Sequence, residues 1–63
     1  MSNRNRLISS LIAMFNEVHG NDIAPDWLVA MYERASDDEL RRKMGNWQQN
    51  YPAEWQRHGI YCM

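Results

Sequence analysis

The stretch of residues 7–18 constrains the fold of this chain more than any other part of the sequence. Its large apolar residues fall in pairs one helical turn apart, which matches an amphipathic helix and breaks the alternation of a strand. Asn3 or Asn5 can cap the start of this helix. Gly20 can end it, because glycine adopts the left-handed conformation without a steric clash. We therefore predict a helix over residues 5–19.

The apolar stripe of this helix is wider than one coiled-coil seam, so it needs cover on more than one side. A chain of 63 residues buries roughly 60% of its unfolded surface, which leaves a single core only marginally sufficient. Such chains often complete their core across a dimer interface, and we predict a homo-oligomer, in the simplest case a dimer. The side chains predicted to carry this self-association keep the spacing of a seam: Ile8, Leu11, Phe15 and Val18.

Residues typical of helix ends, together with the spacing of apolar residues, predict two further helices. Pro25 suits the first position of a helix, where its missing N–H costs nothing, and apolar residues recur at helical spacing over 25–35. Ser36 followed three residues later by Glu39 has the pattern of a capping box, which marks a new helix start. The helix predicted there covers residues 37–50, and its apolar seam is Leu40, Met44, Trp47 and Tyr51.

The C-terminal part of the chain is predicted to add a short helical turn. Pro52 ends the preceding helix because the residue before a proline is pushed out of the helical region. Residues 52–58 can then form one or two turns, closed by Gly59. No repeat, linker or low-complexity segment divides the sequence. We predict an all-α fold, a small bundle of three helices plus this C-terminal helical turn, in a single domain over residues 1–63.

The residue types that could carry metal binding or catalysis are few. A metal ion would have to use His19, His58 and Cys62, which lack the compact ligand pairs of zinc sites. Cys62, the one cysteine, lies next to the terminus with no scaffold to hold a base and oxyanion donors around it. A chain of this length also has little room for a water-excluding pocket. We predict no enzyme activity, no metal and no cofactor.

The sequence also allows a prediction of the cellular compartment of the protein. A single cysteine and the lack of a signal peptide favour the reducing cytoplasm. No segment approaches the roughly 18 apolar residues that span a membrane. Arg4 and Arg6 flank the first apolar stripe, but its polar side carries Ser, Asn and Glu rather than the Lys and Arg of interfacial helices. We predict no membrane partner.

Binding to nucleic acid is the alternative that the sequence leaves open. Seven Lys and Arg against eight Asp and Glu give a net charge of −1, so no global attraction to phosphate exists. The second helix, a tight turn and the third helix nevertheless imitate a helix-turn-helix, with Arg41, Arg42 and Lys43 on the third helix. The start of that helix is acidic, at residues 37–39, and would repel phosphate. A small DNA-binding regulator is therefore the second choice.

Aromatic and arginine residues near the C-terminus favour contact with another protein. Such side chains dominate the energetics of protein interfaces. The residues predicted to contact a partner are Trp47, Tyr51, Trp55, Arg57 and Tyr61. We predict a non-enzymatic accessory protein that acts by protein–protein interaction.

Two segments characterise the chain as a whole, the helix start at residues 36–40 (SDDEL) and the aromatic tail at residues 55–61 (WQRHGIY). In this overall character, over its whole length, the chain resembles the small early-region accessory proteins of lambda-like temperate bacteriophages. The resemblance implies a factor that modulates a host process or the choice between lytic and lysogenic growth. It also implies an unidentified host protein as the partner, in the bacterial cytoplasm, and it carries over no functional residue.

Overall fold

The computed structural model describes residues 3–59, which form four helices and no strand. The helices are α1 (Asn3–His19), α2 (Asp26–Arg34), α3 (Asp37–Asn50) and α4 (Pro52–His58). The predicted all-α fold is confirmed, and α3 has the bounds predicted for it. The bounds of α1 and α2 differ from the prediction by one or two residues.

α1 begins earlier than predicted and ends where predicted. Asn5 lies inside the helix, so it is not the cap. At the other end Gly20 has a φ of 68°, a conformation that residues with a side chain rarely adopt. The backbone N–H of Asn21 donates to the carbonyl of Asn16 at 2.9 Å, which is the six-to-one bond of a Schellman motif.

α2 is two residues shorter than predicted, one at each end. Pro25 precedes the helix instead of opening it, because its ψ of 145° is extended. Its carbonyl still accepts the first helical bonds, from the N–H groups of Leu28 and Val29 at 3.1 and 3.2 Å. Ala35 is also extended, with a ψ of 148°. The chain therefore turns from α2 into α3 within two residues.

The break before α4 follows the predicted chemistry, and the start of α3 shows one of the two bonds of the predicted capping box. The Oγ of Ser36 accepts a hydrogen bond from the N–H of Glu39 at 3.2 Å, as an N-cap does. Pro52 occupies the first turn of α4, where a proline costs no hydrogen bond. The N–H of Tyr51, between the two helices, donates to the carbonyl of Trp47 at 2.8 Å.

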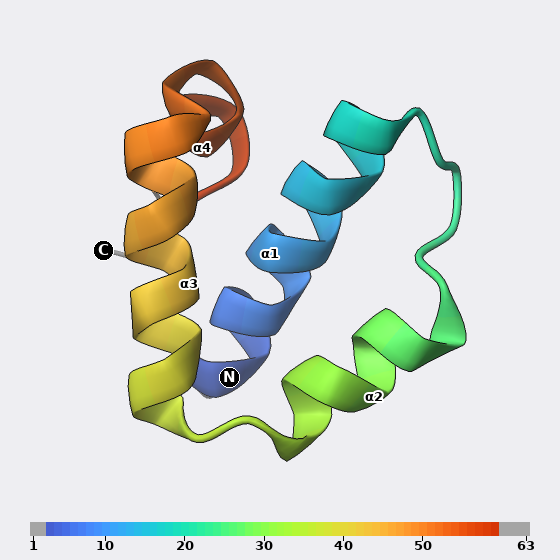
Figure 1. Ribbon diagram of the computed structural model, residues 1–63, viewed down its shortest axis with the longest axis vertical. Helices are drawn as coiled ribbons and strands as arrows, with labels where there is room; N and C mark the ends of the chain where they lie inside the picture. The colour runs from blue at the N-terminus through green and yellow to red at the C-terminus, as the bar shows by residue number, and fades with distance from the viewer. Residues whose placement is uncertain (1–2, 60–63) are drawn as a thin grey trace.

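Figure 1 shows how the helices are arranged. α1 and α3 lie beside one another and run in the same direction, upward in this view, while α2 crosses near the lower end of α1. α4 folds back at the upper end, where it contacts both α1 and α3. α2 therefore packs mainly on α1, and α4 has two helices beneath it.

All four helices contribute side chains to one core. The centre of the stripe on α1 is formed by Leu7, Leu11 and Met14, while Ile8 and Phe15 are only partly buried beside it. Of the seam predicted for self-association through residues 8, 11, 15 and 18, only Leu11 is fully buried in the core of the single chain. The buried residues are Leu7, Leu11, Met14, Leu28, Tyr32, Ala35, Leu40 and Met44.

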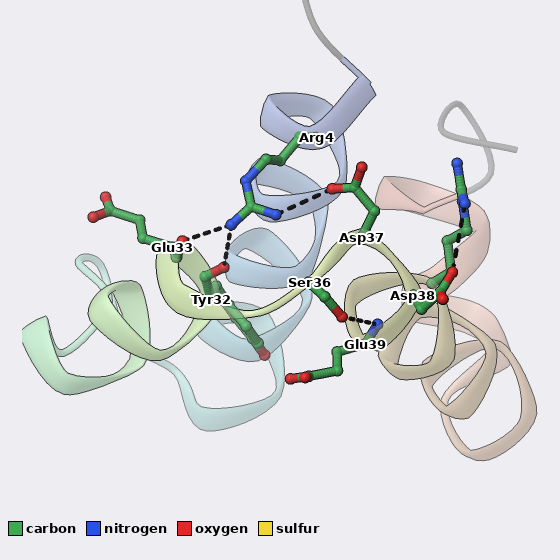
Figure 2. Close-up of polar contacts among 8 residues, drawn as sticks. Arg4, Tyr32, Glu33, Ser36, Asp37, Asp38 and Glu39 are labelled. Carbon is green, nitrogen blue, oxygen red and sulfur yellow. Dashed lines mark hydrogen bonds and ion pairs between the residues drawn. The ribbon is translucent and has the colours of Figure 1, made fainter.

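Arg4 ties the start of α1 to the turn between α2 and α3. Its guanidinium donates to the carbonyl of Glu33 at 2.5 Å and to the carboxylate of Asp37 at 3.1 Å (Figure 2). A weaker contact reaches the carbonyl of Tyr32 at 3.5 Å. A cation at the C-terminal end of α2 and beside the first turn of α3 satisfies carbonyls that have no helical partner.

Gly59 ends α4, but for a reason other than the predicted one. Its φ of −97° is right-handed, so no left-handed conformation requires glycine here. The residue is buried, and a Cβ at this position would lie 2.8 Å from Nε1 of Trp55 and 2.9 Å from the sulfur of Met44. Close packing of these two side chains over the backbone therefore requires glycine.

Candidate interaction surface

Three of the four exposed large apolar side chains of the described residues lie on α2 and on the connection before it, and the fourth, Tyr51, lies between α3 and α4. Ile23 is 84% exposed, Trp27 62% and Met31 39%. Trp27 and Met31 line one depression, and exposed apolar side chains that lie together can mark a contact surface. We call the surface formed by Ile23, Trp27, Met31, Arg34 and Glu39 the α2 face.

The α2 face is hollowed. An open depression of about 420 Å³ separates the outer side of α2 from the first turn of α3. Its floor includes two alanines, whose short side chains leave room for an incoming group. The lining residues are Trp27, Ala30, Met31, Arg34, Ala35 and Glu39.

The spacing of residues along α2 explains why these side chains point outward. At 3.6 residues per turn, Leu28 and Tyr32 share one side of the helix, and both are buried against the core. Trp27, Met31 and Arg34 lie on the neighbouring side. The apolar arc of α2 is wider than the area that α1 can cover, so part of it stays in water.

The side chain of Trp27 contacts α1 through Phe15. Its ring meets that of Phe15 in an edge-to-face arrangement, with centroids 6.1 Å apart and an interplanar angle of 89°. Phe15 in turn contacts the ring of His19, with centroids 4.3 Å apart. Such aromatic pairs contribute about 0.5–1.5 kcal/mol. The indole of Trp27 is therefore positioned by α1 before any partner arrives.

Two opposite charges border the depression. The guanidinium of Arg34 and the carboxylate of Glu39 both line it, from α2 and α3. Neither has an ion-pair partner among residues 3–59. The α2 face thus combines an apolar centre with one free positive and one free negative charge, as the centre and rim of a protein interface do.

The predicted partner-binding residues mostly make contacts within the chain. Trp47 is partly buried, contacts the ring of Tyr51 with centroids 4.6 Å apart, and hydrogen-bonds the side chain of Tyr32. Burial raises the pKa of the Tyr32 hydroxyl, and this bond opposes the rise. Trp55 is partly buried against the core. Tyr51 stays 41% exposed, and Tyr61 lies outside the described residues.

Arg57, another predicted contact residue, joins α4 to α1. Its Nε and Nη2 donate to Oε1 of Glu17 at 2.8 and 2.7 Å, and Nε2 of His58 lies 2.9 Å from Oε2 of the same carboxylate. The hydrogen bond from Arg57 lowers the pKa of Glu17; partial burial opposes this, and the charge of Arg57 and the contact with His58 lower it further. The structure therefore brings together a cluster that sequence spacing did not indicate.

The residues predicted for self-association pack within the single chain. Leu11 is fully buried, and Ile8 and Phe15 are partly buried against the same core. Val18 is also partly buried. These side chains are engaged before a second copy arrives, so their predicted role stays untested.

The residues of the nucleic-acid alternative lie on α3. Arg41 and Arg42 are exposed and Lys43 is partly buried. Arg41 lies 3.9 Å from the carboxylate of Asp38, an exposed pair of little energetic weight. The first turn of α3 holds Asp37, Asp38 and Glu39, so the acidic start that disfavours phosphate is present in the folded chain.

Sequence reasoning missed the α2 face. The apolar residues over 25–35 were used only to predict a helix, and no residue of that helix was among the predicted contact residues. The available signal was the width of the apolar stripe on a helix of only nine residues. A helix at the edge of so small a bundle has one neighbour, which covers one side of it.

Residues 3–59 match neither the pattern of a metal site nor that of a membrane-spanning helix. The described part of the chain contains no group of three or more His, Cys, Asp or Glu side chains placed to hold a metal ion. Within residues 3–59, no helix combines the length and the apolar character needed to cross a membrane.

The chain matches no protein-family model, no curated protein and no solved structure.

Proposed function

We propose that this chain is a non-enzymatic accessory protein that acts by docking its α2 face on another protein surface. The observation that carries the proposal is the 62% exposure of Trp27 beside an open depression. A tryptophan is the side chain most often found at the energetic centre of interfaces. Full burial of a large apolar side chain contributes roughly 1.5–3 kcal/mol, and a partner that covers the exposed part of Trp27 gains a share of this.

The resemblance to small early-region proteins of lambda-like temperate phages supports the same proposal. It points to a bacterial host as the source of the partner and to the host cytoplasm as the place of contact. The accessory role would then be to modulate a host process or phage development. Tyr51, exposed on the α3–α4 junction, is available for an additional contact from the predicted C-terminal set.

Capture from bacterial lysate tests the proposal. A tagged chain is compared with Trp27→Ala and with Gln48→Ala as the control, because Gln48 is an exposed residue of α3 that belongs neither to the α2 face nor to the predicted C-terminal contact residues. We expect Trp27→Ala to reduce the retained partner at least about tenfold, which is the effect of losing one interface anchor, with unchanged helix content. Equal retention by Trp27→Ala and by the unsubstituted chain would contradict the proposal.

Nuclease treatment of the same lysate separates the DNA-binding alternative. Retention by the α2 face is expected to survive nuclease. Retention that disappears with nuclease, and that falls on substitution of Arg41 and Arg42 by alanine, would replace our proposal with a helix-turn-helix-like regulator. Phosphate contacts from these residues would also make binding strongly salt-dependent.

A further inference from the structure

We propose that the partner of the α2 face is a second copy of this chain, related to the first by a two-fold axis. This inference rests on the proposed function, because it concerns the same surface: a second copy covers the α2 face of the free protein, and a host protein that docks there displaces that copy. It assigns the dimer contact to α2 and its flanks rather than to the apolar stripe of α1, whose central residue Leu11 is fully buried in the single chain.

The two charges of the α2 face that are unpaired within residues 3–59, Arg34 and Glu39, favour a second copy as the partner. In a two-fold contact, if residue i of one copy meets residue j of the other, then j also meets i. A surface with one unpaired cation and one unpaired anion is therefore complementary to itself. Arg34 of each copy can meet Glu39 of the other, which gives two ion pairs from one pair of residues. The net charge of −1 leaves little repulsion between whole copies.

The shape of the α2 face also favours a second copy as the partner. The α2 face carries a protruding aromatic ring, Trp27, next to a depression of about 420 Å³ whose lining includes Ala30 and Ala35. A depression of this size lies in the range that accepts small organic groups. A two-fold axis places the Trp27 ring of each copy over the depression of the other. Its edge contact with Phe15 limits the conformational entropy lost on docking.

The exposed surface area of the single chain indicates that each copy folds before it associates. The chain exposes 4423 Å², and a compact monomer of 7.5 kDa is expected to expose about 4,200 Å². The single chain is therefore already folded around its own core. A standard interface needs roughly 800 Å² from each partner, close to a fifth of this surface. Two preformed monomers that meet through α2 and its flanks associate to an extent that depends on concentration.

Charge reversal tests the two-fold arrangement directly. The variants are Arg34→Glu, in which two acidic residues face each other across the axis, and Glu39→Arg, in which two basic residues do. By sedimentation equilibrium from micromolar to millimolar concentration, we expect the unsubstituted chain to reach twice the mass of one chain. Each variant alone should associate at least tenfold more weakly. An equimolar mixture should recover association, because the two variants complement each other.

Two control variants keep the test specific. Arg42→Glu and Asp38→Arg make the same charge changes on α3 outside the depression. We expect each to associate like the unsubstituted chain, and their mixture to gain nothing. Far-ultraviolet circular dichroism checks that every variant keeps its helix content, since Glu39→Arg removes an acidic residue from a helix start. Recovery in the mixture also shows that both variants are folded.

The outcomes separate this inference from the proposed function. A single-chain mass at all concentrations overturns the dimer, and so does a dimer whose variants fail to complement one another. If the chain stays monomeric while Trp27→Ala loses a captured lysate protein, the dimer is wrong and the proposed function stands. If the chain stays monomeric and Trp27→Ala changes nothing in the capture experiment, both are wrong.

Discussion

Gly59 and Gly45 differ in what a methyl group would meet, and this difference predicts opposite effects of one substitution. At Gly59 a Cβ would press on the Trp55 ring and the sulfur of Met44. We expect Gly59→Ala to destabilise the chain by about 1–3 kcal/mol, the usual cost of overpacking. Urea unfolding followed by circular dichroism measures the change.

Gly45 is the matched control. It lies inside α3, and a Cβ there would meet no atom within 4 Å. Alanine is the better helix former, so Gly45→Ala should raise the free energy of unfolding by up to about 1 kcal/mol. Two substitutions with the same sign would show that Trp55 and Met44 do not pack on Gly59 as described.

Glu17 gives the chain a pH-dependent contribution to stability. Its pKa is lowered from an ordinary value of 4.5, chiefly by the hydrogen bond from Arg57. A carboxyl with a depressed pKa in the folded state stabilises that state above its unfolded pKa, and loses this effect as the pH falls through its folded pKa. We expect the unsubstituted chain to melt above Glu17→Gln at neutral pH.

That difference in melting temperature should shrink as the pH falls from 4.5 through the lowered pKa of the folded chain, because the carboxyl of Glu17 is then neutral in the unsubstituted chain as well. Thermal melts of both proteins at neutral pH and near pH 3 measure it. A difference that stays constant over this range would mean that Arg57 and Glu17 are not paired in solution. Added salt should reduce the difference at neutral pH, since the pair is partly exposed.

At the scale of the element, the start of α3 depends on one side chain. The Oγ of Ser36 accepts the N–H of Glu39, and we expect Ser36→Ala to cost about 1 kcal/mol of unfolding free energy. Chemical denaturation measures this value. Ser9→Ala is the control, because Ser9 is exposed inside α1 and alanine is favoured at that position. Equal losses from both substitutions would argue against the cap.

α2 shows how an element can satisfy the core and still leave an apolar surface. Its nine residues are too few to be stable as an isolated helix, so it depends on packing against α1 and on Arg4 at its C-terminal end. Leu28 and Tyr32 supply that packing. Trp27 adds an edge contact with Phe15, but most of its side chain stays exposed, as does part of Met31, and these exposed parts are available to a partner.

At the scale of the whole molecule, the core is small enough for one residue to decide folding. Leu11 is fully buried at the centre of the α1 stripe. Removal of such a side chain costs about 2–5 kcal/mol, which is close to the total stability that one core supplies at this size. We expect Leu11→Ala to lower the melting temperature steeply and to weaken all four helices together.

Ile23→Ala is the control for that prediction. Ile23 is 84% exposed, and surface substitutions usually change the free energy of unfolding by less than about 0.5 kcal/mol. Melts at low protein concentration keep the comparison within the monomer. If Leu11→Ala kept its melting temperature but lost self-association, Leu11 would belong to an interface, as the spacing of the sequence predicts, and not to the core.

The sequence by itself determined the class of fold and most helix ends. Periodicity predicted the helices, and Ser36, Pro52 and Gly20 marked their limits, because capping and backbone preferences depend on residues within about one turn. Gly59 was also predicted to end a helix, but close packing and not a left-handed backbone conformation requires glycine there. Its role depends on Met44, which is distant in the sequence and close only in the folded chain.

Only the tertiary structure decided which side of each apolar stripe is covered. The stripes on α1 and α2 are both wider than one seam, so spacing alone left several rotations equally acceptable. The positions of the neighbouring helices selected Leu7, Leu11 and Met14 for the core and left Trp27 in water. The pairing of Glu17 with Arg57 has the same origin, because burial and long-range contacts depend on how the helices cross.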